Sequence, residues 1–179
     1  MEFPWRDSTV RLAAMNVQHY QVHDGLFAGE YPGSLAPEVT EDRLKFLLEK
    51  GVQTFIDLTT SHDRLDPYEP VLRELGEGLT RHSHEIPDLG VPTSPEVMRG
   101  ILDLLRAELD AGRTCYVHCW GGIGRTGTVI GCWLKESGLD TTAALDEVQR
   151  RYAGGMEKVI RHPRSPQTPE QVRYVKDWR

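Results

Sequence analysis

A short glycine-rich segment constrains the fold of this chain more than any other feature of its sequence. The segment reads VHCWGGIGRTG, from Val117 to Gly127, and places three glycines between Cys119 and Arg125. Glycine lets a backbone turn sharply where other residues would be strained. An apolar run precedes the segment and a helical pattern follows it, so we expect a buried strand, a tight loop and a helix in direct succession.

Segments typical of strands and helices alternate along the rest of the chain. The expected strands cover residues 26–34, 52–59, 79–86 and 114–119. The expected helices lie within residues 37–51, 66–76, 93–112 and 168–178, besides the helix after the glycine-rich loop. This alternation predicts an α/β fold: a single domain, residues 1–179, whose central, mostly parallel twisted sheet is flanked by helices. Residues 26–178 form the expected core and residues 1–25 an N-terminal extension.

The helix expected within residues 93–112 carries its own start signals. Thr93 and Glu96 match a capping box, and Pro95 falls in the first helical turn. The apolar stripe expected on this helix comprises Val97, Ile101, Leu104 and Leu105.

Composition excludes several classes of protein. The net charge of −6 gives no basic excess, so we expect neither a nucleic-acid nor a membrane partner. Three irregularly spaced cysteines without a C-x-x-C pair predict neither a disulfide framework nor a zinc site. The first ten residues lack the pattern of a signal peptide, and no segment is apolar enough to span a bilayer, so we expect a cytoplasmic protein. An anionic substrate must then be captured by a local device.

The glycine-rich loop is such a device. Backbone N–H groups of a tight loop at a helix start form a cradle for a phosphate and favour a thiolate at its centre. We therefore interpret Cys119 as the nucleophile, Arg125 as a planar fork for two phosphate oxygens, and Thr126 as a hydroxyl donor to the thiolate. The loop residues expected to bind phosphate are Trp120, Gly121, Gly122, Ile123 and Gly124. The alternative for Cys119 is a buried structural cysteine.

The stretch HCWGGIGRTG resembles the H-C-x-x-G-x-x-R-S/T-G motif of the cysteine-dependent protein tyrosine phosphatase superfamily. The resemblance covers about Leu26 to Trp178 and is to the dual-specificity and small bacterial-type branches, including the cyclin-dependent-kinase-associated phosphatases. It implies phosphomonoester hydrolysis through a phosphocysteine intermediate, with no metal or other cofactor. It also implies that His118 orients the loop by hydrogen bonds.

The same resemblance implies a general acid on a loop before the last strand. Asp88 stands at that place in the sequence Ile86-Pro87-Asp88, where tyrosine-specific members carry Trp-Pro-Asp. The alternative is an aspartate that simply turns the chain after a proline. Asp63 or Asp66 are then the next candidates for the acid.

Two glutamines near the end of the chain, Gln167 and Gln171, match a pair that orients the hydrolytic water in many members of the superfamily. For Gln171 an alternative is a capping box with Thr168. Asp57 ends a strand and is expected to cap or turn the chain, and Arg64 lies on a polar loop that could border the site.

The substrate is less constrained than the chemistry. The loop contains no lysine, which favours a phosphorylated protein over inositol phosphates and leaves phosphotyrosine-only against dual specificity open. The alternatives are an inositol-phosphate, phosphoinositide or RNA 5′-phosphatase, and a non-catalytic phosphate-binding module.

Overall fold

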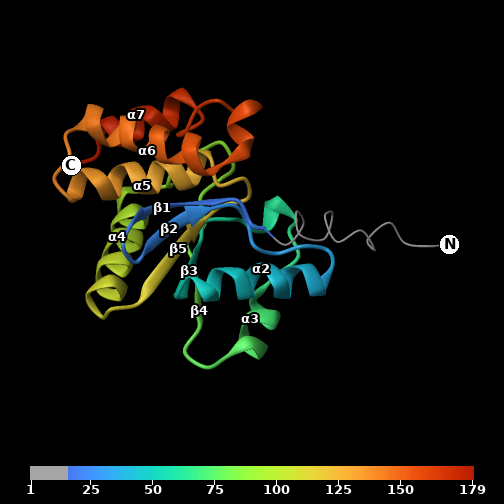
Figure 1. Cartoon of the computed structure of the whole chain (residues 1–179). Helices are drawn as coiled ribbons and strands as arrows, with labels where there is room; N and C mark the ends of the chain where they lie inside the picture. The colour runs from blue at the N-terminus through green and yellow to red at the C-terminus, as the bar shows by residue number, and fades with distance from the viewer. Residues whose placement is uncertain (1–15) are drawn as a thin grey trace.

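The structure is a computed structural model that describes residues 16–179 (Figure 1). The expectation about a signal peptide in the first ten residues lies outside this range. The strands are β1 (His19–His23), β2 (Leu26–Gly29), β3 (Val52–Asp57), β4 (Thr80–Ser83) and β5 (Thr114–His118). The helices are α2 (Pro37–Glu49), α3 (Glu69–Leu75), α4 (Pro95–Asp110), α5 (Gly124–Glu136), α6 (Thr141–Gly155) and α7 (Pro169–Asp177), with short 3₁₀ turns η2 (Ser61–Asp63) and η3 (Glu157–Ile160).

The five strands form one sheet in the order β1-β2-β5-β3-β4. The pairs among β2, β5, β3 and β4 are parallel, and only β1 runs antiparallel to its neighbour β2. The expected α/β fold with a mostly parallel sheet is therefore confirmed. The proposed start of the core at Leu26 is wrong, because β1 belongs to the sheet. This strand offers only two buried apolar residues, Tyr20 and Val22, which is too short a pattern to detect.

The two faces of the sheet are covered by different helices (Figure 1). Side chains alternate across a strand, so Tyr116 of β5 and Phe55 of β3 face the layer that contains α2 and α3. Val117 and Ile56, their next neighbours, face the larger core under α4, α5 and α6. Both faces of β5 are consequently dry, and this strand is the centre of the molecule.

Helix α4 starts one residue later than its sequence suggests. Its N-cap is Ser94 with extended backbone, and no side chain caps it, so the capping box of Thr93 and Glu96 is wrong. Pro95 occupies the first helical position, where its missing N–H costs nothing. The fully buried stripe is accordingly Met98, Ile101, Leu102 and Leu105, while Val97 and Leu104 are only partly buried.

Helix α5 is enclosed on all sides. It packs against the sheet and against α4, α6 and α7, and its residues Gly124 to Leu134 are all buried. Within residues 16–179, none of the helices has the length and apolar character needed to traverse a membrane.

The carboxyl ends of three parallel strands meet at one edge of the sheet. Asp57, Ser83 and His118, the last residues of β3, β4 and β5, are in register. The chain leaves all three strands there, so the loops after them gather around the start of α5.

Candidate active site

The glycine-rich loop closes tightly between β5 and α5. Gly122 has a φ of 73°, and a side chain there would collide with the backbone of Gly29. The carbonyl of Trp120 accepts a 3.0 Å hydrogen bond from the N–H of Tyr31. These contacts clamp the loop against β2 and leave Cys119, which is almost fully buried, beside the start of α5.

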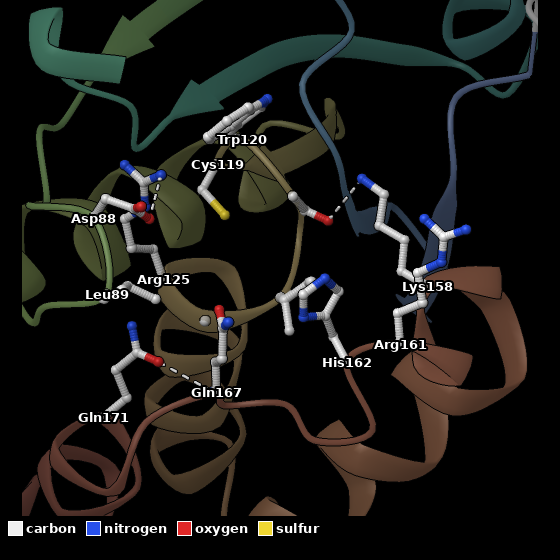
Figure 2. Close-up of a pocket in the computed structure, with 13 residues that line it drawn as sticks. Asp88, Leu89, Cys119, Trp120, Arg125, Lys158, Arg161, His162, Gln167 and Gln171 are labelled. Atoms are coloured by element: carbon white, nitrogen blue, oxygen red, sulfur yellow. Dashed lines mark hydrogen bonds and ion pairs between the residues drawn. The ribbon is translucent and has the colours of Figure 1, made fainter.

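Arg125 lies in the first turn of α5 and is only 2% exposed. Its Nη1 and Nη2 donate to the two carboxylate oxygens of Asp63 at 2.8 and 3.0 Å. Nη1 also donates to the carbonyl of Ile86 at 3.2 Å, and Nη2 lies 3.0 Å from Oδ1 of Asp88 (Figure 2). The guanidinium is therefore held in one orientation at the edge of the cavity that contains Cys119.

Asp63 is the main partner of this arginine, although the sequence indicated it only as a substitute acid. It ends the turn η2, where the backbone N–H of Thr60 donates to its Oδ2 at 2.7 Å. Burial opposes ionisation, but the hydrogen bonds from Arg125 and Thr60 outweigh it and lower the pKa of Asp63. The capping-box spacing of Thr60 and Asp63 indicates the turn η2 but not the contact with Arg125.

Asp88 reaches the site from the loop between β4 and α4. Its side chain is 54% exposed and pairs with Arg125 on the open side of the guanidinium. The loop turns back directly afterwards, because Leu89 adopts a φ of 59° and the N–H of Gly90 donates to the carbonyl of Pro87 at 3.0 Å. Asp88 is thus brought together with Cys119 and Arg125 around one cavity.

The start of α7 holds this loop in place. Gln171 is buried, and its Nε2 donates to the carbonyl of Gly90 at 2.9 Å while its Oε1 accepts from the N–H of Thr168 at 3.1 Å. Thr168 in turn donates to the carbonyl of Leu89 at 3.3 Å. The capping-box interpretation of Gln171 is therefore correct. Its Oε1 would lie only 2.7 Å from a Cβ on Gly124, so a side chain at this first residue of α5 would displace the carboxamide of Gln171.

Gln167, unlike Gln171, is exposed. Its backbone N–H donates to Oε1 of Gln171 at 3.0 Å, and its exposed side chain lines the cavity (Figure 2). A water-positioning role remains a prediction for both glutamines, but Gln171 has most of its carboxamide already engaged.

His118 is fully buried under the loop. Its Nδ1 lies 3.3 Å from the carbonyl of Cys119, which can only accept, so Nδ1 carries the proton and Nε2 accepts from the hydroxyl of Tyr68 at 2.8 Å. Burial lowers the pKa of His118 and keeps the imidazole neutral. These bonds tie the histidine to the backbone of Cys119 and not to its thiol.

The remaining predicted residues lie at or beyond the edge of the site. Asp57 turns the chain, since its Oδ1 accepts from the N–H and hydroxyl of Thr59 at 2.8 and 2.6 Å. The hydroxyl of Thr126 is buried and has no hydrogen-bond partner among residues 16–179. Arg64 and Asp66 are exposed and do not line the cavity.

The cavity has a volume of about 420 Å³. Asp88 and Leu89 lie at one side of it, and Trp120, 55% exposed, stands at its mouth (Figure 2). Three basic residues that the sequence analysis missed line it on the side away from Asp88: Lys158, Arg161 and His162. The basic composition of residues 158–164 was the only sequence signal for them. No group of three metal-ligating side chains occurs within the described chain.

Residues 29–139 match a family model described as "Polymorphic toxin system, DSP-PTPase phosphatase". The matched range contains the loop with Cys119 and Arg125, together with Asp63 and Asp88.

Among individual relatives, the chain is 26% identical over 152 residues to the inositol diphosphatase DSP2 of Oryza sativa subsp. japonica, covering 82% of this chain and 67% of the rice protein. It is 28% identical over 135 residues to cyclin-dependent kinase inhibitor 3 of Rattus norvegicus, covering 74% of this chain and 60% of the rat protein. The matched part of the chain spans between 37% and 67% of the length of curated relatives, these two included.

Solved structures share the fold. A mutant form of Tk-PTP superposes with a TM-score of 0.71 at 23% identity, over 90% of this chain and 93% of that one. The kinase associated phosphatase KAP, with its catalytic cysteine replaced by serine, gives a TM-score of 0.72 at 20% identity, over 91% and 93% of the two chains.

Proposed function

Because the chain belongs to the family described as "Polymorphic toxin system, DSP-PTPase phosphatase", we propose that it hydrolyses phosphomonoesters through a phosphocysteine intermediate. Membership of this family makes it an enzyme of the dual-specificity phosphatase type. The observation that supports the mechanism is the common cavity of Cys119, Arg125 and Asp88.

In the first step the Sγ of Cys119 attacks phosphorus. An S–P bond forms, the P–O bond to the leaving group breaks, and Asp88 gives its proton to the departing oxygen. Arg125 and the N–H groups of the loop hold the equatorial oxygens, where charge accumulates in the transition state. Asp63 accepts from both Nη groups of Arg125 and so holds the guanidinium in one orientation beside the cavity.

In the second step water attacks the phosphorus of phosphocysteine. Asp88 accepts a proton from the water, the S–P bond breaks, and inorganic phosphate leaves. Gln167, whose carboxamide lines the cavity and has no hydrogen-bond partner within residues 16–179, is the glutamine better placed to orient the water. Covalent catalysis divides one difficult displacement into two easier ones.

We propose phosphotyrosine in proteins as a substrate, with phosphoserine and phosphothreonine included if the enzyme has dual specificity. Trp120 and Leu89 support this, because their exposed side chains at the mouth offer apolar surface to an aromatic ring. We also place the enzyme in the cytoplasm, where thiols stay reduced.

A second candidate is an inositol phosphate. The absence of lysine from the glycine-rich loop argued against it, but Lys158 and Arg161 bring positive charge to the cavity from another segment. The name of the rice relative, an inositol diphosphatase, supports the same candidate.

Replacing the nucleophile tests the proposal. Cys119→Ser should abolish steady-state hydrolysis of p-nitrophenyl phosphate, and rapid acid quenching of the wild-type enzyme should reveal one phosphate on the peptide that contains Cys119. The matched control is Cys115→Ala, because burial raises the pKa of Cys115 to about 12 and leaves that thiol unreactive. Substantial turnover by Cys119→Ser, or wild-type protein that binds phosphate without hydrolysing esters, contradicts the proposal.

A further inference from the structure

Two basic residues at the cavity have side chains without a partner among residues 16–179. Arg161 and His162 follow the turn η3, are exposed, and line the cavity that contains Cys119. Neither side chain makes a hydrogen bond or an ion pair with any residue in the range 16–179. In a protein of net charge −6, an unpaired arginine beside an imidazole, both facing the cavity that contains Cys119, points to an anionic ligand.

A third basic residue, Lys158, connects this segment to the glycine-rich loop. Lys158 forms an ion pair with Glu30 and donates to the carbonyl of Gly121 at 3.4 Å. Figure 2 shows this contact, with Arg161 and His162 on the same side of the cavity and Asp88 on the other. The cationic side therefore begins at the rim of the loop that holds the scissile phosphate. We call Lys158, Arg161 and His162 the cationic wall.

We propose that the cationic wall binds a second phosphate of the substrate. This inference rests on the proposed function and develops its second candidate, an inositol phosphate: the substrate is a small molecule that carries two or more phosphates on one compact scaffold. An arginine fork and a neighbouring imidazole suit phosphate oxygens, and Lys158, already paired, contributes charge and holds the segment to the loop.

Size favours a small molecule over a peptide. The cavity of about 420 Å³ contains both the nucleophile and the cationic wall, and volumes in this range suit small ligands. Both phosphates must then lie within one cavity. Two phosphates attached to a single ring are close enough together to do so.

The experiment compares substrates that differ by one phosphate. The probes are myo-inositol monophosphate and bisphosphate, and a tyrosine phosphopeptide with and without a second phosphorylated residue. We expect kcat/KM to be about tenfold higher for inositol bisphosphate than for the monophosphate, as one charge-assisted interaction provides. Arg161→Ala should remove this preference, and an exposed residue of this kind is replaceable without loss of folding.

The matched control is Arg164→Ala, which removes the same charge three residues further on at an exposed position outside the cavity. It should keep the tenfold preference. Equal kcat/KM for the two inositol phosphates, a preference that survives Arg161→Ala, or a preference seen only among the peptides overturns the proposal.

The experiments distinguish a failure of the cationic wall from a failure of the proposed function. If the wild-type enzyme hydrolyses p-nitrophenyl phosphate but shows no preference, only the cationic wall is refuted. If it hydrolyses nothing, the proposed function fails, and calorimetry on Cys119→Ser still tests the wall. The bisphosphate should bind about tenfold more tightly than the monophosphate, and Cys119→Ser with Arg161→Ala should abolish the difference.

Discussion

The two ends of β5 carry the same interaction in two different surroundings. Just before the strand, Nε and Nη2 of Arg113 donate to the two carboxylate oxygens of Glu108 at 2.5 and 2.6 Å. Just after it, Arg125 grips both carboxylate oxygens of Asp63 at 2.8 and 3.0 Å. Each is a bidentate pair of an arginine with a carboxylate from another element.

The difference lies in what surrounds the fork. The side chain of Arg113 is 42% exposed, and beyond Glu108 the pair reaches only Thr54, which donates to that carboxylate. Arg125 is buried, touches Asp88 and Ile86, and borders the cavity with Cys119. A bidentate pair of this kind can take part in chemistry only where its guanidinium also borders a cavity, as that of Arg125 does.

Lysine substitutions of the two arginines should differ most in their effect on kcat/KM. Arg125→Lys keeps the charge but loses the planar fork, so we expect kcat/KM for p-nitrophenyl phosphate to fall about 10³-fold, as for loss of a transition-state donor. Arg113→Lys should leave kcat/KM unchanged. Steady-state kinetics on both variants checks this, and near-wild-type kinetics of Arg125→Lys contradicts the assigned role.

Asp88 also pairs with Arg125, and its replacement has the next largest expected effect on hydrolysis. Asp88→Asn cannot donate a proton, so hydrolysis of phosphotyrosine should fall about 10²-fold, a typical contribution of general acid catalysis. An aryl phosphate with a weakly basic leaving group should suffer far less, because that group departs without a proton. The basic limb of the pH–rate profile should also disappear. Equal losses for good and poor leaving groups, with both limbs retained, would place the acid elsewhere.

Amide substitutions of Asp63 and Glu108 test the carboxylates of the two pairs directly. Asp63→Asn keeps the shape but weakens the hold on the fork, so kcat/KM should fall about tenfold, in line with small errors in positioning. The inhibition constant of inorganic phosphate should rise with it. Glu108→Gln is the control and should change neither quantity; an unaffected Asp63→Asn enzyme would make both pairs structural.

The smallest expected effect is on stability and concerns the structural pair. Hydrogen bonds from Arg113 lower the pKa of Glu108 to about 2. A depressed pKa stabilises the fold above the ordinary value of 4.5, and this stabilisation is lost as the pH falls toward about 2. Thermal unfolding should therefore show Glu108→Gln melting a few degrees below wild type at pH 7, with the gap closing near pH 2.5. A gap that is independent of pH contradicts the ionic origin.

Local features of this chain were readable from its sequence. Cys119 and Arg125 are separated by a short glycine-rich loop, and their spacing predicted that both lie at one site; both line the same cavity. The alternation of strand and helix patterns predicted the mostly parallel sheet, because side-chain periods of 2.0 and 3.6 residues are local properties. The position of Asp88 followed from the resemblance, and the cap formed by Gln171 from its spacing to Thr168.

Only the tertiary structure decided which distant segments contact the glycine-rich loop and Arg125. Nothing in the local pattern of Asp63 indicates that it faces Arg125, and nothing in Gln171 indicates that it holds the carbonyl of Gly90. The cationic wall likewise reaches the cavity only because η3 folds back beside the loop. These contacts depend on how helices stack on the sheet, and packing of segments far apart along the chain leaves no periodic trace in sequence.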